Sequence, residues 1–413
     1  MTEQRIEVAD VFRCHGQEFL DAHGRGLFRE QRRALRDIAI CRTAALGGHK
    51  CKCDHCDYEE FSYNSCRNIH CPKCQARRRA KWLREQATCL LPVQYFHVVF
   101  TLPGGLGPLA LQNKRVIYTA LFRAASAALL TIGRDPKHLG AELGFLAVLH
   151  TWGQNLLLHP HVHCVVPGGG LSPDRSLWIS CRKGFFLPVR VLSRFFRGRF
   201  LQLLGQSYAR GELTLKGRLT PLAQASEWQR FLESLARTEW VVYSKPPFGS
   251  AVQVLKYLAR YTYRVAIANS RLAALHDGSV TFHWKDYAHG GQQSTMTLRA
   301  VEFIRRFLLH VLPAGFVRIR HYGFLANRLR RERIPLLRKL LGDDAPHEEI
   351  SPVSTATSTS ESTHDTDSHE NADTQNAHVC PACKKGHLVR VAKVCSEPSP
   401  FHDFLRICQH DSS

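Results

Sequence analysis

The run HPHVHCVVPGGG at residues 159–170 predicts a buried strand that carries metal ligands. Residues two apart share one face of a strand, so His161 and His163 project together while Val162 faces an apolar side. Pro160 places His159 at the start of this strand, and the three glycines indicate a turn at its end. Two imidazoles on one face are typical of a divalent-metal site. A lone His-x-His pair is more often structural, so this interpretation depends on a nucleophile elsewhere in the chain.

Regular patterns surround this strand on both sides. Alternating apolar residues (Phe96, Val98 and Phe100) predict a strand at 94–102, and further strands are predicted at 145–152, 156–166 and 279–284. Helical spacing predicts helices at 114–130 and 251–268. Because strands and helices are interleaved, the sequence predicts an α+β fold.

The helix predicted at 251–268 contains two tyrosines on one face. Tyr257 and Tyr261 are four residues apart, and Arg260 and Arg264 form an adjacent basic stripe with the same spacing. A tyrosine hydroxyl attacks a phosphodiester only where positive charge offsets that of the phosphate, and a metal ion or an arginine can supply it. Core packing of the two rings is the ordinary interpretation of this spacing. Together with the histidine strand, the tyrosines favour a nuclease site.

Fifteen cysteines, several of them clustered near the N-terminus, predict structural zinc. Cys53 and Cys56 form one C-x2-C knuckle, and Cys71 and Cys74 form another. Two such knuckles can complete the tetrahedral shell of one Zn²⁺ ion, with Cys66 as a further candidate ligand. Buried free cysteines are the alternative, but so dense a cluster is not typical of a core.

A third knuckle lies in the C-terminal tail. Cys380 and Cys383 have the same C-x2-C spacing, which makes them candidates for a second zinc site. Their candidate partners are irregularly spaced: Cys395, His402, Cys408 and His410. A frayed tail without metal is the alternative interpretation.

The net charge of +21, from 56 Lys and Arg against 35 Asp and Glu, indicates a polyanionic partner. A basic run directly after the second N-terminal knuckle could contact phosphates, although a solvated helix face is equally compatible with it. Its charged residues are Arg77, Arg78, Arg79 and Lys81. Residues 343–378 hold nine acidic residues and no Lys or Arg, so the rest of the chain is more basic than the total indicates.

Four parts are expected along the chain. Residues 1–90 form an N-terminal helical and zinc-binding domain, and 91–342 form a catalytic domain. The acidic, Ser/Thr-rich segment 343–378 is expected to be a disordered linker, and 379–413 a small cysteine-containing tail. The polar N-terminus and the Pro- and Gly-broken apolar stretch at 90–111 predict neither a signal peptide nor a membrane span. A cytoplasmic protein without a membrane partner is therefore expected.

In combination, these motifs resemble rolling-circle transposases of the insertion sequence ninety-one family, in the two-tyrosine form of the HUH endonuclease superfamily. The likeness covers roughly residues 15–340, in the order of the family. It rests on four motifs: 63–75 (YNSCRNIHCPKCQ), 159–170, 257–265 and 320–327 (RHYGFLAN).

The resemblance implies a central antiparallel sheet flanked by helices, with the histidine strand in its middle. It also implies that His161 and His163 bind a catalytic Mg²⁺ or Mn²⁺ ion. A third, polar ligand is expected, and the sequence leaves Gln154, His159 and, less strongly, Asn269 open for this role.

The resemblance further implies that Tyr261 and Tyr257 are the nucleophiles, assisted by Arg260 and Arg264. Tyr261 ranks first because some relatives keep a single tyrosine in an R-Y-x-x-R context, which Arg260 to Arg264 match. How the two tyrosines divide the strand transfers stays open.

The implied chemistry is cleavage of single-stranded transposon ends, with formation of a 5′-phosphotyrosine, followed by transfer to target DNA. The phosphotyrosine conserves the bond energy, so rejoining needs no ATP. The sequence contains no G-x4-G-K-[ST] loop, and strand unwinding is therefore expected to depend on host replication or helicase proteins. The expected location is the bacterial cytoplasm, in association with the nucleoid.

Three other functions compete with this one. A plasmid or phage replication initiator would use the same chemistry, but the cysteine-rich head favours a transposase. A non-catalytic zinc-finger regulator of DNA explains the charge and the cysteines and leaves the histidine strand and tyrosine helix as coincidence. A histidine-ligated metalloenzyme for small molecules leaves the strong positive charge without a role.

Overall fold

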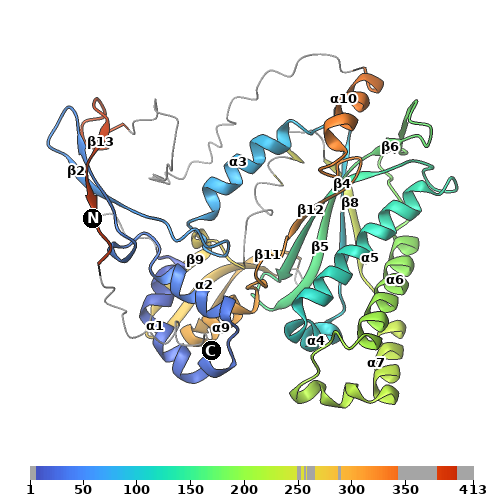
Figure 1. Ribbon diagram of the computed structural model, residues 1–413, viewed down its shortest axis with the longest axis horizontal. Helices are drawn as coiled ribbons and strands as arrows, with labels where there is room; N and C mark the ends of the chain where they lie inside the picture. Colours follow the sequence, from blue (N-terminus) through green and yellow to red (C-terminus); the bar gives the residue numbers. More distant parts are fainter. Residues whose placement is uncertain are drawn as a thin grey trace. The chain divides into compact units, whose positions relative to one another are not determined.

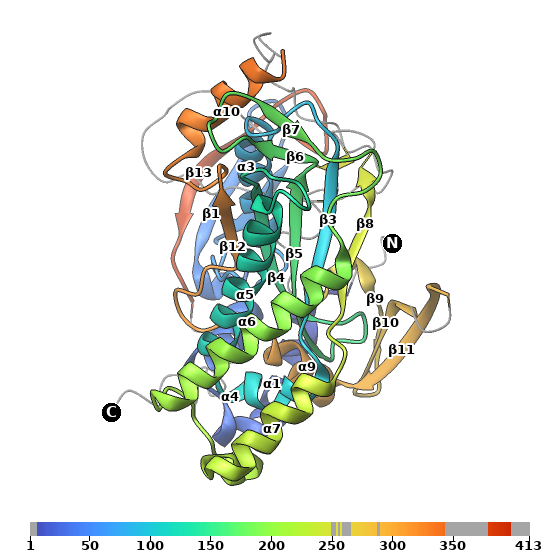
Figure 2. The ribbon, with the colours of Figure 1, turned by 90° about the vertical axis from the view of Figure 1, so that its right-hand side faces the viewer.

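The chain divides into two compact units, which Figures 1 and 2 show in ribbon form. The first unit takes in the chain up to Arg78, Ile267–Val311 and the C-terminal part, and the second takes in Arg79–Ala266 and the chain from Leu312. The computed structural model describes residues 6–248, 253–254, 257, 266–286, 290–342 and 379–397, apart from the side chains of 76–77 and 246–248. The acidic segment 343–378, expected to be a linker, lies outside the described residues.

The second unit is built on a five-stranded antiparallel sheet, with strand order β12-β4-β5-β3-β8. β5, which carries His161 and His163, is the central strand, and the α+β fold with a middle histidine strand is confirmed. The five strands are β3 (Tyr95–Thr101), β4 (Gly144–Trp152), β5 (Leu158–Pro167), β8 (Val242–Phe248) and β12 (Ile319–Gly323).

Helices cover one face of this sheet, where alternate strand residues form the main core. Val162 and Cys164 of β5 and Phe100 of β3 lie in this core together with residues of α5 (Lys114–Arg134) and α6 (Val189–Ala209). α5 is long and apolar enough to cross a membrane, the one such helix in the described part of the chain. Most of its residues are buried in the main core, which accounts for its apolar character. The remaining helices of this unit are α4 (Gly107–Gln112), α7 (Ala225–Arg237) and α10 (Arg330–Leu340).

The opposite face of the sheet carries a smaller cluster. Val165 of β5 and Val148 of β4 pack there with Trp82 of α3 (Gln75–Ala87), and Tyr257 packs against the same cluster. Because strand residues alternate between faces, the odd-numbered histidines of β5 lie on this side and not in the main core. This smaller face therefore positions the candidate site.

Two glycine motifs are explained by close packing. β5 is followed by β6 (Gly169–Leu171), which pairs with β7 (Trp178–Ser180), so the glycine run enters a short strand and does not form only a turn. A side chain at Gly170 would lie 2.5 Å from the Glu142 carbonyl oxygen. Gly323 has a positive φ of 58°, and a Cβ there would lie 1.6 Å from the Leu143 carbonyl oxygen. The 320–327 motif thus shapes the end of β12.

The helical part of the first unit includes a later segment of the chain, Ile267–Val311. α9 (Ala300–Leu309) packs on α1 (Val8–His23) and α2 (Arg29–Ala39), and the Phe12 and Phe307 rings meet edge to face at 5.2 Å. Gln31 also donates a hydrogen bond to the carbonyl oxygen of Leu308. Residues 267–311 thus join the N-terminal helices, whereas the sequence placed them in a continuous domain at 91–342. This part also holds the sheet of β9 (Leu272–His276), β10 (Ser279–Asp286) and β11 (Gln292–Arg299).

A second sheet of the first unit joins the two ends of the chain. β1 (Gly48–Cys53) forms a hairpin with β2 (Glu59–Tyr63) and also pairs with β13 (Leu388–Val394). All three strands are antiparallel, and β1 lies in the middle. The tail that carries Cys380 and Cys383 is therefore tied to the N-terminal cysteine region.

Candidate functional site

Three histidines from neighbouring strands meet on the smaller face of the five-stranded sheet. His161 and His163 of β5 share this face, and the register of β4 on β5 pairs His150 directly with His161. One ring nitrogen from each of His150, His161 and His163 lies within 4.8 Å of the others. We call these three residues the histidine group.

The histidine group fits a divalent metal ion. The ring centroids of His150 and His163 are 4.3 Å apart, and those of His161 and His163 are 4.6 Å apart. Burial lowers the pKa of His161 to about 4 and that of His163 well below its ordinary value, so both rings are neutral at pH 7, the form that binds metals. Three imidazoles suit a first-row transition-metal ion better than Mg²⁺, which prefers oxygen ligands.

The third candidate metal ligand in the structure differs from the candidates that the sequence predicted. His150 completes the histidine group, whereas His159 is exposed at the start of β5 and lies outside it. Gln154 lies in the turn between β4 and β5. The side chain of Asn269 accepts a hydrogen bond from the backbone N–H of Val8, in the first unit. His150 was missed because only the strand register places it opposite His161.

Tyr257 lies beside the histidine group. Its hydroxyl oxygen is 3.1 Å from Nδ1 of His163 and 2.6 Å from Nε2 of His97, on β3. Nε2 of His97 is in turn 2.7 Å from Nδ1 of His163, and these two rings stack at 5.0 Å. Tyr257 is therefore a residue of the site face and not of the main core.

His97 is a second residue that sequence reasoning missed. It is 3% exposed, and desolvation lowers its pKa to about 3, so its ring is neutral and offers one donor and one acceptor nitrogen. The Tyr257 hydroxyl and Nδ1 of His163 both lie within hydrogen-bond distance of one of these nitrogens, Nε2, which bonds to one of the two at a time. Alternation along β3 places His97 on the other face of the strand from Phe96 and Val98. Only the pairing of β3 with β5 shows that this face is the one that carries the histidine group.

The other residues of the predicted tyrosine helix cannot be placed in the same way. Tyr261, Arg260 and Arg264 lie outside the described residues. Their roles as first-ranked nucleophile and supporting cations remain predictions from the sequence.

The cysteines of the first unit form two groups of four. The first cysteine group joins the second N-terminal knuckle to two upstream residues and consists of Cys41, Cys66, Cys71 and Cys74. The Sγ–Sγ distances from Cys41 to Cys74 and from Cys66 to Cys74 are both 3.6 Å. A tetrahedral shell with Zn–S distances of about 2.3 Å places the sulfurs about 3.8 Å apart. The geometry fits zinc, and Cys66 lies in this group of four.

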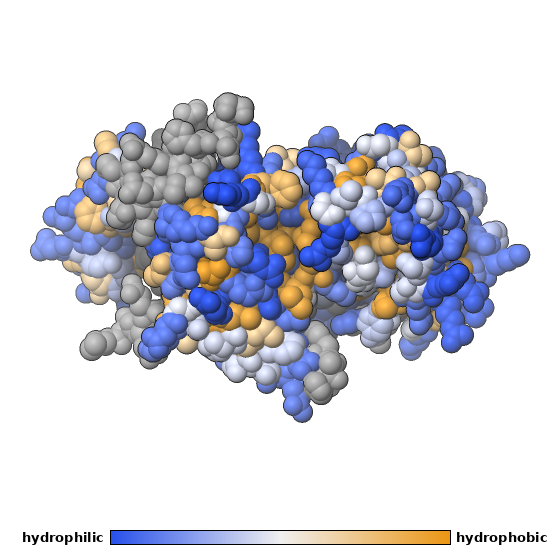
Figure 3. Space-filling model, turned by 90° about the horizontal axis from the view of Figure 1, so that it is seen from below, coloured by the Kyte–Doolittle hydropathy of each residue, from blue (hydrophilic) through white to orange (hydrophobic). Residues whose placement is uncertain are grey.

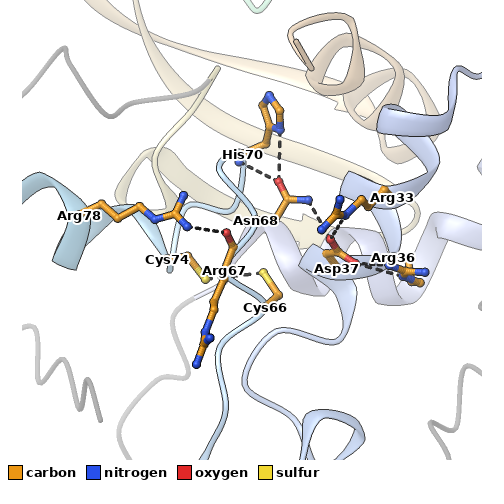
Figure 4. A network of polar contacts seen from close by, with 9 residues as sticks. All are labelled: Arg33, Arg36, Asp37, Cys66, Arg67, Asn68, His70, Cys74 and Arg78. Carbon is orange, nitrogen blue, oxygen red and sulfur yellow. Dashed lines mark hydrogen bonds and ion pairs between the residues drawn. The ribbon is translucent and has the colours of Figure 1, made fainter. Parts of the chain in front are cut away.

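A polar network holds the loop that carries the first cysteine group (Figure 4). Asn68 donates a hydrogen bond to Asp37 of α2, and its side-chain oxygen accepts one from the backbone N–H of His70. Arg78 donates to the carbonyl oxygen of Arg67. Figure 4 shows Cys66 and Cys74 pointing toward one another beside this network. The polar residues thus fix the loop in the conformation that brings the sulfurs together.

The second cysteine group joins the first knuckle to the tail and consists of Cys53, Cys56, Cys380 and Cys383. The single shell expected from the two N-terminal knuckles is therefore wrong. The first knuckle lies at the tip of the β1–β2 hairpin, and the chain returns along β2 before it reaches Cys66. A strand of five residues is about 17 Å long, which is too far for sulfurs that must share one ion.

The basic run after the second knuckle lies in α3. Arg79 and Lys81 are exposed, as is Arg78, whose guanidinium also bonds to the Arg67 carbonyl. The side chain of Arg77 lies outside the described residues. Figure 3 shows hydrophilic residues over much of one face, with hydrophobic residues gathered between them.

Comparison with protein families gives two matches. A family described as "Putative transposase" matches residues 144–333, which include β4, β5 and Tyr257. A family described as "Transposase zinc-binding domain" matches residues 11–102, which include the first cysteine group and the first knuckle. No solved structure matches the chain significantly.

Two curated relatives are similar over most of their length. The chain is 50% identical to the putative transposase y4qJ of Sinorhizobium fredii over 393 residues. This aligned region covers 95% of this chain and 96% of the relative. It is 30% identical to the transposase for insertion sequence element IS801 of Pseudomonas savastanoi pv. phaseolicola over 315 residues. This aligned region covers 73% of each chain. Both relatives and both families point to the same class of protein.

Proposed function

Because the chain belongs to the insertion sequence ninety-one family of transposases, with an N-terminal zinc-binding domain, we propose that it moves DNA by rolling-circle-type transposition. The chemistry would be cleavage and transfer of single DNA strands through a 5′-phosphotyrosine. One observation carries this proposal: the hydroxyl of Tyr257 lies 3.1 Å from His163, a member of the histidine group. A nucleophile beside a candidate metal site is what such a reaction needs.

In the proposed reaction, a tyrosine oxygen attacks the scissile phosphorus of a transposon end. The Tyr–O–P bond forms as the P–O3′ bond breaks; the tyrosine hydroxyl loses its proton, and the leaving 3′-oxygen takes one up to become a 3′-hydroxyl. A 3′-hydroxyl of the target later attacks the phosphotyrosine, which restores the phosphodiester and the free tyrosine. The number of phosphoester bonds is unchanged, so no nucleotide hydrolysis is required.

The residues of the site have distinct proposed tasks. The histidine group would hold Mn²⁺ or Mg²⁺, with Mn²⁺ favoured by the donor chemistry; when bound, this ion would offset charge on the scissile phosphate. His97 would hold the hydroxyl of Tyr257 in place. Tyr261, with Arg260 and Arg264 beside it in the sequence, would be the other nucleophile, and the sequence motif ranks it first.

DNA is the substrate of a transposase, and the single-stranded form is the proposed one. Arg79 and Lys81 are exposed cations that would contact its phosphates. We further propose that host replication or helicase proteins unwind the strands, and that the protein works in the bacterial cytoplasm at the nucleoid. The family match sets aside a replication initiator, a non-catalytic regulator and a small-molecule enzyme as primary functions.

The experiment is to incubate the full chain and Mn²⁺ with single-stranded oligonucleotides that cover the regions flanking its gene. Covalent adducts are counted on denaturing gels, and mass spectrometry identifies the modified tyrosine. We expect adducts in the wild type, a different distribution in Tyr257→Phe and in Tyr261→Phe, and no adduct in the double variant. An undiminished adduct in the double variant would contradict both nucleophile assignments.

A further inference from the structure

The two ends of the chain meet at the second cysteine group. Cys53 and Cys56 come from the N-terminal region and Cys380 and Cys383 from the tail, yet all four sulfurs lie within 4.8 Å of one another. The Sγ–Sγ distances are 3.7 Å for Cys53 to Cys383 and for Cys56 to Cys380. These distances are too long for a disulfide bond, at about 2.05 Å, and match the edge of a tetrahedral zinc–thiolate shell, at about 3.8 Å.

We propose that these four cysteines bind a second structural zinc ion, which fastens the C-terminal tail to the N-terminal zinc-binding domain. The matched zinc-binding family covers residues 11–102 only, so half of this site lies outside it. The tail would then be an integral part of the first unit. The proposal replaces the two alternatives that the sequence left open, in which Cys380 and Cys383 bind zinc with other residues of the tail or the tail binds no metal.

Backbone groups around the sulfurs fit thiolate ligands. The N–H of His55 donates to Sγ of Cys53, and the N–H of Gly386 donates to Sγ of Cys383, both at 3.3 Å. Hydrogen bonds of this kind favour the thiolate form and orient it, as is common around metal ligands. Each knuckle therefore contributes one sulfur that already accepts a backbone hydrogen bond.

The two knuckles are also packed closely against one another. A Cβ at Gly386 would lie 2.5 Å from Oδ1 of Asp54 and 2.6 Å from Sγ of Cys53, so this position accepts only glycine without displacement. The side chain of Asp54 accepts a hydrogen bond of 2.7 Å from the N–H of His387, and the N–H of Asp54 donates to the His387 carbonyl oxygen at 3.0 Å. These contacts bring the knuckles together independently of any ion.

The strand pairing continues this arrangement away from the sulfurs. β13 pairs with β1 from Cys53, opposite Leu388, to Gly48, opposite Val394. A zinc ion at one end of the ladder would close a loop of about 320 residues between Cys56 and Cys380. Because the last two ligands come from the tail, the site can be completed only after almost the whole chain has been synthesised.

The first test counts zinc in the purified full chain by native mass spectrometry. We expect two zinc ions in the wild type and one in the Cys380→Ser/Cys383→Ser variant. Cys395→Ser is the matched control, because Cys395 lies in the same tail, is exposed and belongs to neither group; it should keep two. One zinc in the wild type, or two in the double variant, would overturn the proposal.

A second test uses only the wild-type chain and so does not depend on the folding of variants. Cysteine alkylation is followed by mass spectrometry while a chelator removes zinc stepwise. Cys380 and Cys383 should lose protection together with Cys53 and Cys56, in a step separate from that of the first cysteine group. Alkylation of Cys380 and Cys383 in zinc-loaded protein, at the rate of exposed Cys14, would refute the site.

Discussion

The hydroxyl oxygen of Tyr257 lies 2.6 Å from Nε2 of His97, a buried histidine on the strand next to the histidine strand. The same nitrogen lies 2.7 Å from Nδ1 of His163. His97 therefore connects the candidate nucleophile to the candidate metal site. We infer that it positions Tyr257, because a hydroxyl held at hydrogen-bond distance samples fewer orientations than a free one.

Replacing His97 tests this positioning role. In a Tyr261→Phe background, where only Tyr257 can form an adduct, His97→Phe should slow adduct formation by roughly 10²-fold, because the ring remains but its hydrogen-bonding nitrogens are lost. Single-strand binding, measured by fluorescence anisotropy, should be unchanged. His97→Gln, which can still hydrogen-bond, should recover part of the rate. Wild-type adduct rates in His97→Phe would show that His97 has no such role.

His150 is the candidate metal ligand that the strand register adds to His161 and His163. His150→Ala should weaken Mn²⁺ binding by roughly 10-fold or more, since one of three imidazoles is removed. Mn²⁺ binding is measured directly by the electron paramagnetic resonance signal of the free ion, without reference to activity. His159→Ala is the matched control and should bind Mn²⁺ as the wild type does. Equal weakening in the two variants would contradict the assignment of His150 over His159.

Arg79 and Lys81 are expected to contact DNA phosphates. Each phosphate contact on a single strand contributes about 0.7 to the slope of log K against log salt. Arg79→Ala with Lys81→Ala should therefore reduce this slope by up to about 1.4. Arg237→Ala, which removes an exposed cation from the end of α7, is the control and should leave the slope unchanged. An unaltered slope in the double variant would favour the solvated-face interpretation.

Gly323 is predicted to be essential for the end of β12. Gly323→Ala should lower the free energy of unfolding by more than about 2 kcal/mol, because it combines a positive φ with a clash against the Leu143 carbonyl. Gly315 also has a positive φ, of 68°, but has open space around it, so Gly315→Ala should cost only about 1 kcal/mol. Urea unfolding compares the two variants. Equal losses would show that the clash is relieved at little cost.

His321 gives the second unit a pH dependence. Burial, with the charge of Arg330, lowers its pKa to about 4, and its ring lies 3.0 Å from the side-chain oxygen of Gln86. Below pH 6.5 the unfolded chain binds a proton that the folded chain does not, so stability falls as the pH falls from 6.5 towards 4. Urea midpoints should therefore drop less from pH 7 to pH 5 in His321→Gln than in the wild type. An identical drop would exclude His321 as a contributor.

Some of the site could be predicted because it depends on neighbours in sequence. The two-residue spacing of His161 and His163 places both on one face of any strand that buries Val162. The charge of +21 and the C-x2-C knuckles likewise predicted a polyanionic partner and zinc from residue types alone. His150 and His97 carried no comparable signal, because each is a single histidine in an apolar strand.

The zinc ligands show the same division. The C-x2-C spacing predicted each pair as half of a shell, since a tight turn brings both sulfurs to one ion, and each pair lies in a group of four cysteines. It could not identify the partner of a pair, and Cys41, which has no nearby partner in the sequence, was not proposed as a ligand. The β1–β2 hairpin separates the two N-terminal knuckles, and β13 brings the tail to the first of them.

By itself, the sequence of this protein determined the α+β class, the histidine face of β5 and the cysteine pairs, because these follow from backbone geometry over a few residues. The tertiary structure alone decided which histidine completes the histidine group, which ring lies beside the Tyr257 hydroxyl and which knuckles come together in a group of four cysteines. Those choices depend on strand register and on pairing between segments up to about 330 residues apart, which local spacing does not encode.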